Sequence, residues 1–194
     1  MPEVDNARSL KINSYFLMHG VVLQNRVVGR PNPALPVPMP IDIAIEPPDQ
    51  PETVALLAEL DSYLTKLYPP EATYLLDVAS LRAPDIRFFV ARKDAAAVGC
   101  GALRLEEDGY GEIKRMFVAP TARGLGIAKR LLLAIEAEAR RLGLHTLRLE
   151  TGLYQTEALG LYAAVGYREI QPFGEYAADG PHSRFLAKPL APAD

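Results

Sequence analysis

The chain has 194 residues, of which 49% are hydrophobic, and its formal net charge is −3. This length and hydrophobic content are enough for one well-buried core and do not require two domains. The acidic balance argues against a broad nucleic-acid-binding surface, which is usually basic.

The first forty residues differ in composition from the rest of the chain. Residues 31–40 are too rich in proline for a helix or a central strand and are typical of an extended linker. The apolar run Ile12–Leu23 hints at a secretory signal, but polar residues interrupt it and no convincing cleavage site follows. It is also shorter than the about 20 apolar residues that span a bilayer. We predict an N-terminal extension over 1–40, which is a mobile arm, a strand on a partner subunit or a leader before Met39, and one domain over 41–194.

The next segments alternate between strand and helix patterns. Ile41–Ile45 has the period of two of a half-buried strand, and the apolar spacing of Pro51–Leu67 predicts an amphipathic helix. A second short helix is predicted over Glu71–Ser80. Residues 86–91 and 97–105 are rich in β-branched and aromatic side chains, which favours a hairpin.

Six further elements are predicted in the remaining sequence: strand 110–118, helix 124–142, strand 145–150, helix 155–165, and a closing strand pair, 167–173 with 184–188. Strict alternation along the first of these strands would put Glu112, Lys114, Met116 and Val118 on one face, where Lys114 could neutralise Glu112. Tyr167, at the start of the closing pair, is expected to pack in the core.

Cysteine and histidine usage gives little sign of metal or redox chemistry. The single cysteine, Cys100, lies in an apolar run, so we expect a buried, unreactive thiol and a reducing, cytoplasmic location. His19, His145 and His182 lie far apart and share no metal-ligand spacing with the cysteine. We therefore predict no metal.

A glycine-rich turn, Arg123–Ala128, separates a predicted strand from a long predicted helix. Such a turn presents unpaired backbone N–H groups at the positive end of the helix dipole, where a phosphate binds. Lys129 and Arg130 add positive charge. A Rossmann fingerprint would need glycine at Lys129, and the Gly-Lys-Ser/Thr of a P-loop is absent. The turn therefore predicts a phosphorylated ligand outside those two classes.

Together with its neighbours, this turn resembles the GNAT superfamily of acyl-CoA-dependent N-acyltransferases. The resemblance covers about Ile41–Leu190 and is carried by Gly111–Pro120, Arg123–Ala128 with its helix, Leu147–Gly152 and Gln155–Tyr167. It implies an α/β (α+β) fold with a mixed, mostly antiparallel sheet of six to seven strands and about four helices. The implied order is β-α-α-β-β-β-α-β-α-β-β.

The resemblance also implies acetyl-CoA as cosubstrate and direct acyl transfer to an amine without a covalent enzyme intermediate. Strands 112–118 and 145–150 would splay apart to bind pantetheine, and the amides of the glycine turn would bind the pyrophosphate. The implied binding residues are Met116, Phe117, Val118, Arg123, Gly124, Leu125, Gly126, Ile127, Ala128, Lys129 and Gln155. Gln155 stands where many members have asparagine, so it is either a pantetheine ligand or a neighbour of the helix cap.

Catalytic roles are also implied by the resemblance. Tyr162 stands where many members place a tyrosine that protonates the departing thiolate, and a phenol with a pKa of about 10 suits that role. The alternative is an aromatic side chain packed in the core. Glu112 and Glu150 are candidate bases, with Glu112 placed first because some members carry a catalytic glutamate on that strand. Either carboxylate could instead be exposed or salt-bridged.

Acceptor specificity depends on segments in which family members vary. The candidate residues are Tyr68, Glu71, Phe173 and Tyr176, whose rings and carboxylate suit a small cationic amine. The same segments could be proline-stabilised surface loops. Transfer to a protein lysine or N-terminus and acyl-CoA sensing without catalysis stay open. We expect no nucleic-acid or membrane partner, and a homodimer is suggested by analogy with relatives.

Overall fold

The computed structural model describes residues 40–69, 75–174, 176 and 181–191, all within one compact unit, residues 38–194. The extension predicted for 1–40 lies outside them, apart from Pro40. The strands and α-helices are β1 (Ile41–Ile45), α1 (Pro51–Leu67), β2 (Ile86–Lys93), β3 (Ala96–Leu105), β4 (Gly111–Val118), α2 (Ile127–Arg141), β5 (Thr146–Gly152), α3 (Thr156–Ala164), β6 (Arg168–Glu169) and β7 (Ser183–Pro189). Short 3-10 turns occupy Ser80–Arg82 and Pro120–Ala122.

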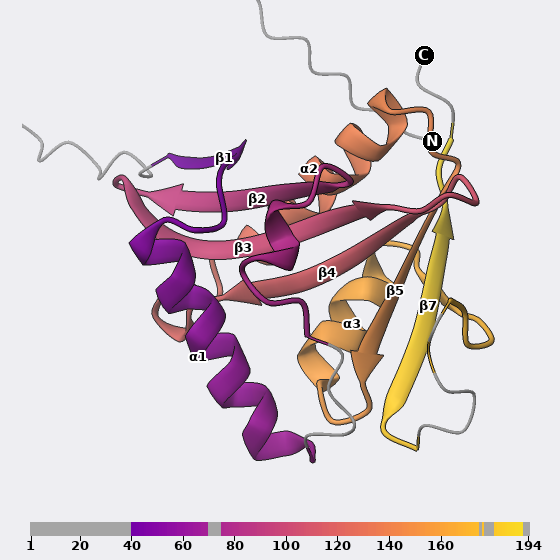
Figure 1. The fold of residues 1–194 in the computed structure, drawn as a ribbon. Coiled ribbons are helices and arrows are strands. Elements are labelled where there is room, and N and C mark those ends of the chain that lie inside the picture. The colour runs from indigo at the N-terminus through magenta and orange to yellow at the C-terminus, as the bar shows by residue number, and fades with distance from the viewer. Residues whose placement is uncertain (1–39, 70–74, 175, 177–180, 192–194) are drawn as a thin grey trace, which may run out of the picture. The chain divides into compact units, whose positions relative to one another are not determined.

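The strands form one seven-stranded sheet in the order β1-β2-β3-β4-β5-β7-β6 (Figure 1). Only the β4–β5 pair is parallel, and the other neighbours are antiparallel. The predicted mixed, mostly antiparallel sheet is therefore confirmed. The described residues contain three α-helices, one fewer than the order suggested by the resemblance.

The missing element is the second helix predicted over Glu71–Ser80. Residues 70–74 lie outside the described ranges, but 75–79 are not helical, so the prediction is wrong there. The Asp77 carboxylate accepts a hydrogen bond of 2.7 Å from the Ser80 backbone N–H, and this bond lowers the pKa of that carboxyl. An aspartate that bonds locally to the backbone in this way favours a turn over a continuous helix.

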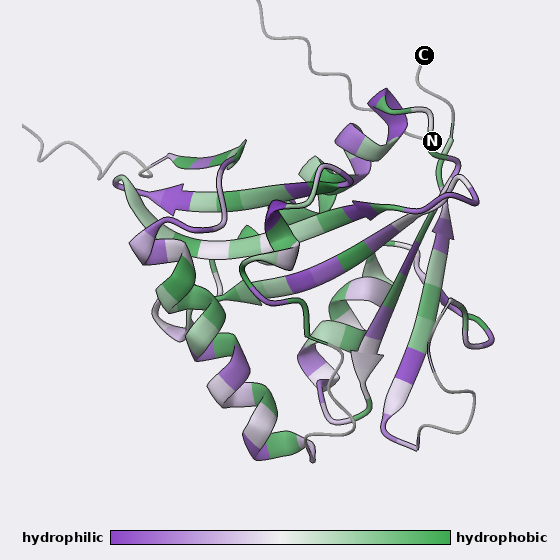
Figure 2. Cartoon of the chain, viewed as in Figure 1, coloured by the Kyte–Doolittle hydropathy of each residue, from purple (hydrophilic) through white to green (hydrophobic). Residues whose placement is uncertain are grey.

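Two hydrophobic clusters hold helices on the two faces of the sheet. Along β2, Phe88 and Val90 pack with the α1 cluster, whereas Phe89 and Ala91 pack with the α2 cluster. This is the alternation that a strand buried on both faces requires. Figure 1 shows α1 on the near face with α2 and α3 behind the sheet, and Figure 2 shows hydrophobic stretches on the strands and a mixture of hydrophobic and hydrophilic residues along α1.

The strict alternation predicted along 110–118 is wrong because β4 contains a β-bulge. The register between β3 and β4 shifts there, so that Arg115 and Met116 together lie opposite Gly101, and Arg115 has a positive φ of 56°. Beyond the bulge, Met116 and Val118 pack with the α2 cluster. Bulges of this kind redirect side chains and are frequent beside active sites.

β4 and β5 separate after a short stretch of pairing. Gly111–Ile113 pairs in parallel with Leu147–Leu149, and then β4 runs on to Val118 while β5 runs on to Gly152 without further pairing between them. Figure 1 shows the two strands diverging. The splaying implied by the resemblance is confirmed, and it leaves one edge of Lys114–Val118 without a partner strand.

Candidate active site

The glycine turn opens α2 with two residues in the left-handed region. Gly124 and Gly126 have φ of 78° and 72°, and a Cβ at either position would meet open space. α2 has no side-chain cap and no acidic residue in its first turn. Its first intrahelical acceptor is the Gly126 carbonyl, which receives the Arg130 N–H at 3.1 Å. The amides that precede Arg130 at this helix end are therefore suited to an anion.

A cavity of about 460 Å³ runs from this turn between β4 and α3. Ten residues of the implied acyl-CoA set line it: Met116, Phe117, Val118, Arg123, Gly124, Gly126, Ile127, Ala128, Lys129 and Gln155. The eleventh, Leu125, does not line it and is 49% exposed. The structure thus brings together residues from the β4 edge, the turn and the start of α3.

The basic side chains near the turn have different surroundings. Arg123 Nε donates to the Val118 carbonyl at 3.4 Å, and Lys129 is exposed at the cavity. Arg130 donates instead to the Ile41 carbonyl in β1 and does not line the cavity. Two of the three basic residues therefore border the proposed pyrophosphate position.

A second, smaller cavity of about 100 Å³ adjoins the first. Tyr162 lines both, as do Leu60, Met116, Gln155 and Ala158. The Gln155 side-chain oxygen accepts hydrogen bonds from the Gly152 N–H at 2.9 Å and from the Thr151 hydroxyl at 3.2 Å. This joins the end of β5 to the start of α3, so Gln155 both fixes this corner and borders the two cavities.

Tyr162 lies in α3 and is only 6% exposed. Burial raises the pKa of its hydroxyl, which therefore stays protonated at neutral pH. Its ring packs edge-to-face against Tyr167 at a centroid distance of 5.7 Å. Tyr167 is buried, as predicted. Tyr162 is therefore both a core aromatic and a residue at the junction of the cavities.

The two candidate bases have different environments. Glu150 lines the small cavity and accepts a hydrogen bond of 2.6 Å from the Ser183 hydroxyl. Burial raises the pKa of its carboxyl, while Ser183 and the positive charge of Lys114 lower it. Glu112 lines neither cavity.

Glu112 belongs to a buried network with Lys114 and Tyr176. The Tyr176 hydroxyl donates to its carboxylate, and the Lys114 ammonium lies 3.4 Å from it. Lys114 also donates to the Tyr176 hydroxyl at 2.6 Å. The predicted neutralisation of Glu112 by Lys114 is confirmed, and it leaves this carboxylate tied to other protein groups.

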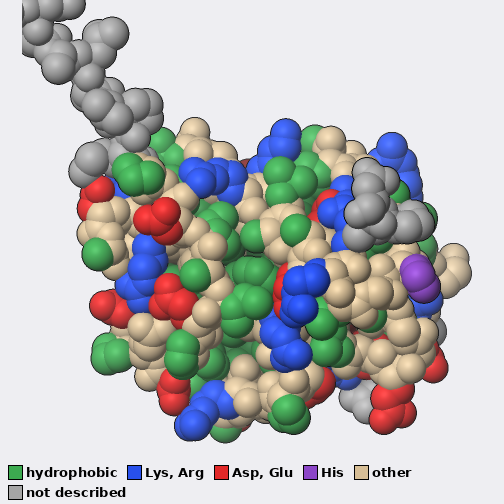
Figure 3. Space-filling model, turned by 90° about the horizontal axis from the view of Figure 1, so that it is seen from above, with side chains coloured by type: hydrophobic (Ala, Val, Ile, Leu, Met, Phe, Trp, Pro, Cys, Tyr) green, Lys and Arg blue, Asp and Glu red, His purple; other side chains and the backbone are tan. Residues whose placement is uncertain are grey.

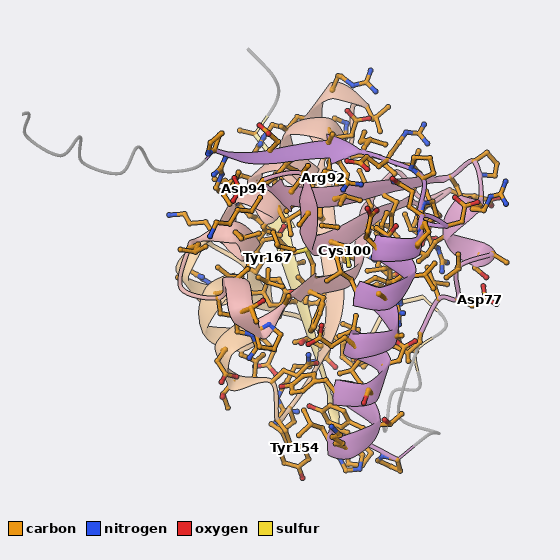
Figure 4. All side chains as sticks on the ribbon, turned by 90° about the vertical axis from the view of Figure 1, so that its left-hand side faces the viewer. Asp77, Arg92, Asp94, Cys100, Tyr154 and Tyr167 are labelled. Atoms are coloured by element: carbon orange, nitrogen blue, oxygen red, sulfur yellow. The ribbon has the colours of Figure 1, made fainter. Side chains whose placement is uncertain are left out.

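The predicted acceptor residues separate in the structure. Tyr68, the residue after α1, lines the small cavity, and its ring stacks on that of Tyr154 with the ring centroids 5.6 Å apart. Figure 4 shows Tyr154 near the end of α1. A Cβ at Gly152 would come within 2.1 Å of the Tyr68 hydroxyl, so glycine there makes room for the ring. Phe173 packs against Tyr176, with ring centroids 5.2 Å apart, in an aromatic cluster that includes Tyr110, and Phe173 does not line the small cavity. Tyr176 contacts Glu112 as described above, and Glu71 lies outside the described residues.

Sequence reasoning missed several side chains at the site. Leu60 and Tyr63 of α1 reach the large cavity across the sheet, and Arg115 reaches the small one through the bulge. Ser183 of β7 lies beside Glu150 of β5 because these two strands are paired. The helical spacing of α1 could have indicated Leu60 and Tyr63 as inward-facing residues, but no local pattern marks Arg115 or Ser183.

The surroundings of Cys100 and the distribution of charged side chains complete the description of the molecule. Cys100 is fully buried, as predicted, and burial raises the pKa of its thiol to about 12. No cluster of three or more His, Cys, Asp or Glu among the described residues could hold a metal. Acidic and basic side chains are mixed on the face shown in Figure 3. None of the described helices is long and apolar enough to cross a membrane.

Comparisons with known proteins agree on one family. Residues 53–167 match the model of the acetyltransferase (GNAT) family. The chain is 53% identical over 151 residues to the IAA acetyltransferase of Azospirillum brasilense, covering 77% of this chain and 98% of that protein. Among solved structures, one from Klebsiella pneumoniae is 37% identical, with a TM-score of 0.66 over 78% of this chain and 98% of its own. The PaiA N-acetyltransferase of Thermoplasma acidophilum, solved with coenzyme A, is 19% identical and shares the fold, with a TM-score of 0.61 over 78% of this chain and 99% of its own.

Proposed function

We propose, because the chain belongs to the acetyltransferase (GNAT) family, that it transfers an acetyl group from acetyl-CoA to the primary amine of a small molecule. The observation that carries this proposal is the meeting of two cavities at Tyr162. The larger cavity ends at the uncapped α2 N-terminus, and the smaller contains a carboxylate, Glu150, whose pKa is raised. Donor and acceptor would thus approach one another from opposite sides.

Backbone groups would do most of the donor binding. The amides of the first α2 turn suit the pyrophosphate, and the open space at Gly126 lets it approach closely. The unpaired edge of Lys114–Val118 offers hydrogen-bonding groups to the amide-containing pantetheine, as a sheet edge does to an added strand. Arg123 and Lys129 would contribute charge at the phosphate end.

Glu150 is the better-supported base. A primary amine arrives mainly as an ammonium ion and must lose a proton before it attacks. Glu150 borders the small cavity, and its raised pKa brings it closer to the neutral range in which a carboxylate accepts that proton, directly or through water. The Glu112 carboxylate already accepts a hydrogen bond from Tyr176 and pairs with Lys114, so it is less available to accept a proton from the amine. We therefore reverse the order of the two candidates given by the resemblance.

Tyr162 would act on the leaving group. The amine nitrogen forms a bond to the acyl carbon, the carbon–sulfur bond breaks, and the electron pair leaves on sulfur. A tyrosine hydroxyl that stays protonated can donate a hydrogen bond to the sulfur as its negative charge develops. Its position on both cavities supports this role because the thioester must lie where donor and acceptor meet.

The test is a transfer assay on the whole chain. The protein is incubated with acetyl-CoA and a panel of amines, amino acids, a lysine-containing peptide and a peptide with a free N-terminus. Release of coenzyme A thiol and the mass of the product are followed together. Release that depends on a small amine, with a product 42 Da heavier, supports the proposal. Acetylation of the peptides alone would show that the acceptor is a protein and not a small molecule. Binding of acetyl-CoA without transfer to any acceptor would indicate an acyl-CoA sensor.

A further inference from the structure

Arg115 is a buried guanidinium at the acceptor cavity. It occupies the β4 bulge, its side chain is 3% exposed, and it lines the small cavity together with Glu150. Its positive φ is uncommon for a residue with a side chain. The fold therefore holds a permanent positive charge in a residue that lines the cavity, in the backbone conformation that the bulge imposes.

The hydrogen bonding of Arg115 is incomplete. A guanidinium has five N–H donors, and among the described residues this one has a single acceptor, Asp61, which bonds to Nη1. Its buried Nε has no partner among those residues. Asp61 is 43% exposed, so much of its charge is solvated, whereas Arg115 is shielded from water. The ion pair therefore leaves the buried Nε of this cavity-lining residue without an acceptor among the described residues.

Glu150 presents the complementary charge in the same cavity. Its hydrogen-bond donor, Ser183, is neutral, and the nearby Lys114 ammonium is hydrogen-bonded to Glu112 and Tyr176. A ligand with both an ammonium and a carboxylate would satisfy Glu150 and Arg115 at once. The remaining wall includes apolar side chains, among them Leu60, Leu64 and Leu75, which would suit an apolar substituent.

We propose that the acceptor is an amine that also carries a carboxylate, such as an apolar α-amino acid, and that Arg115 binds this carboxylate. The inference rests on the proposed function and adds the substrate class. Arginine is suited to the role because its planar fork can bind both oxygens of a carboxylate. The ammonium end then faces Glu150, so one contact selects the substrate and the other deprotonates it.

The test compares acceptors in which the carboxylate is kept, amidated or removed: L-leucine, L-leucinamide and 3-methylbutylamine, and the corresponding phenylalanine series, with each rate expressed per concentration of free amine. Coenzyme A release gives kcat and KM for each. We expect at least one acid to exceed both its amide and its decarboxylated amine by tenfold or more in kcat/KM. Equal or better rates with the amides or amines would overturn the inference while leaving the proposed function intact. If acetyl-CoA binds but no acceptor causes release of coenzyme A, both the inference and the proposed function are contradicted.

Variants then assign the preference to Arg115. Arg115→Met should raise KM for the acid at least tenfold and abolish the discrimination against the amide, with little change in KM for the amide. Arg115→Lys should keep part of the discrimination, because it keeps the charge but loses the fork. Asp61→Asn is the matched control, since it disrupts the same ion pair but keeps the guanidinium. Discrimination that survives in Arg115→Met or disappears in Asp61→Asn would contradict the assignment.

Discussion

The two cavities that meet at Tyr162 differ in the parts of the chain that line them. The larger is lined mainly by the end of β4 and by the glycine turn that follows it a few residues later in the sequence. The smaller is lined by Tyr68 just after α1, Lys114 of β4 and Glu150 of β5, so segments far apart in the sequence supply its side chains. Donor binding would therefore depend on backbone geometry, whereas acceptor binding and proton transfer would depend on individual side chains.

Replacing Glu150 should have the largest effect on the acceptor side. Glu150→Gln keeps the shape of the side chain but removes the base, and we expect kcat/KM to fall by about 10²-fold or more with little change in acetyl-CoA affinity. Steady-state kinetics with the best acceptor and calorimetric titration of acetyl-CoA measure the two effects. An unchanged kcat/KM would exclude Glu150 as the base.

Tyr162→Phe separates the reaction step from binding. The ring and its packing against Tyr167 remain, and only the hydroxyl is lost. We expect kcat to fall by roughly 10- to 100-fold with acetyl-CoA affinity unchanged. Kinetics with a thioester whose thiol is more acidic provides the control, because a better leaving group needs less help from the phenol. A deficit of the same size with both thioesters would point to a packing role.

Glu112 lies in the same sheet as Glu150, but we expect its replacement to affect stability more than the rate. Glu112→Gln leaves the buried Lys114 without its carboxylate, and we expect the free energy of unfolding to fall by on the order of 2 kcal/mol. The expected loss in kcat/KM is below about tenfold, which is less than for Glu150→Gln. Urea denaturation and kinetics on one preparation test both statements. A larger rate loss for Glu112→Gln would restore the order suggested by the resemblance.

Ser183 should tune the pH dependence of the rate. Its hydroxyl stabilises the ionised form of Glu150 and so lowers the pKa of that carboxyl. Ser183→Ala should therefore raise this pKa and move the acidic limb of the kcat/KM profile to higher pH, with the plateau above it little changed. Ser183→Thr retains a hydroxyl and should return the limb toward its original position. A limb that stays in place in Ser183→Ala would disconnect Ser183 from the base.

The smallest expected effect lies on the donor side. Leu125 is exposed and does not line the cavity, although its backbone belongs to the glycine turn. Leu125→Ala should change the Kd for acetyl-CoA by less than about threefold, because the helix-start contacts come from the main chain. A much larger change would mean that donor binding depends on this side chain, and it would weaken the distinction between the two cavities.

The same distinction explains what could be predicted from the sequence. The turn at Arg123–Ala128 was predictable because glycine spacing and a following helix determine its geometry locally. The bulge at Arg115 was not, because it is a mismatch in pairing with β3 that no alternation pattern reveals. Phe173 was assigned to the acceptor site because it lies in a segment in which family members vary, but its ring packs with Tyr110 and Tyr176 and does not line the small cavity. The short helix predicted over Glu71–Ser80 is absent from residues 75–79, where the Asp77 carboxylate accepts a hydrogen bond from the Ser80 N–H that favours a turn.

The most direct test of the account is calorimetric titration of acetyl-CoA into the wild type, Gly126→Glu and Gly143→Glu. Both glycines have positive φ and open space beyond Cβ, but Gly126 precedes α2 and Gly143 follows it. We predict binding in the wild type and Gly143→Glu, and at least about 100-fold weaker binding in Gly126→Glu because its carboxylate would oppose the pyrophosphate. Absence of binding in the wild type, or equal Kd values for the two variants, would contradict the claim that the α2 N-terminus holds the donor.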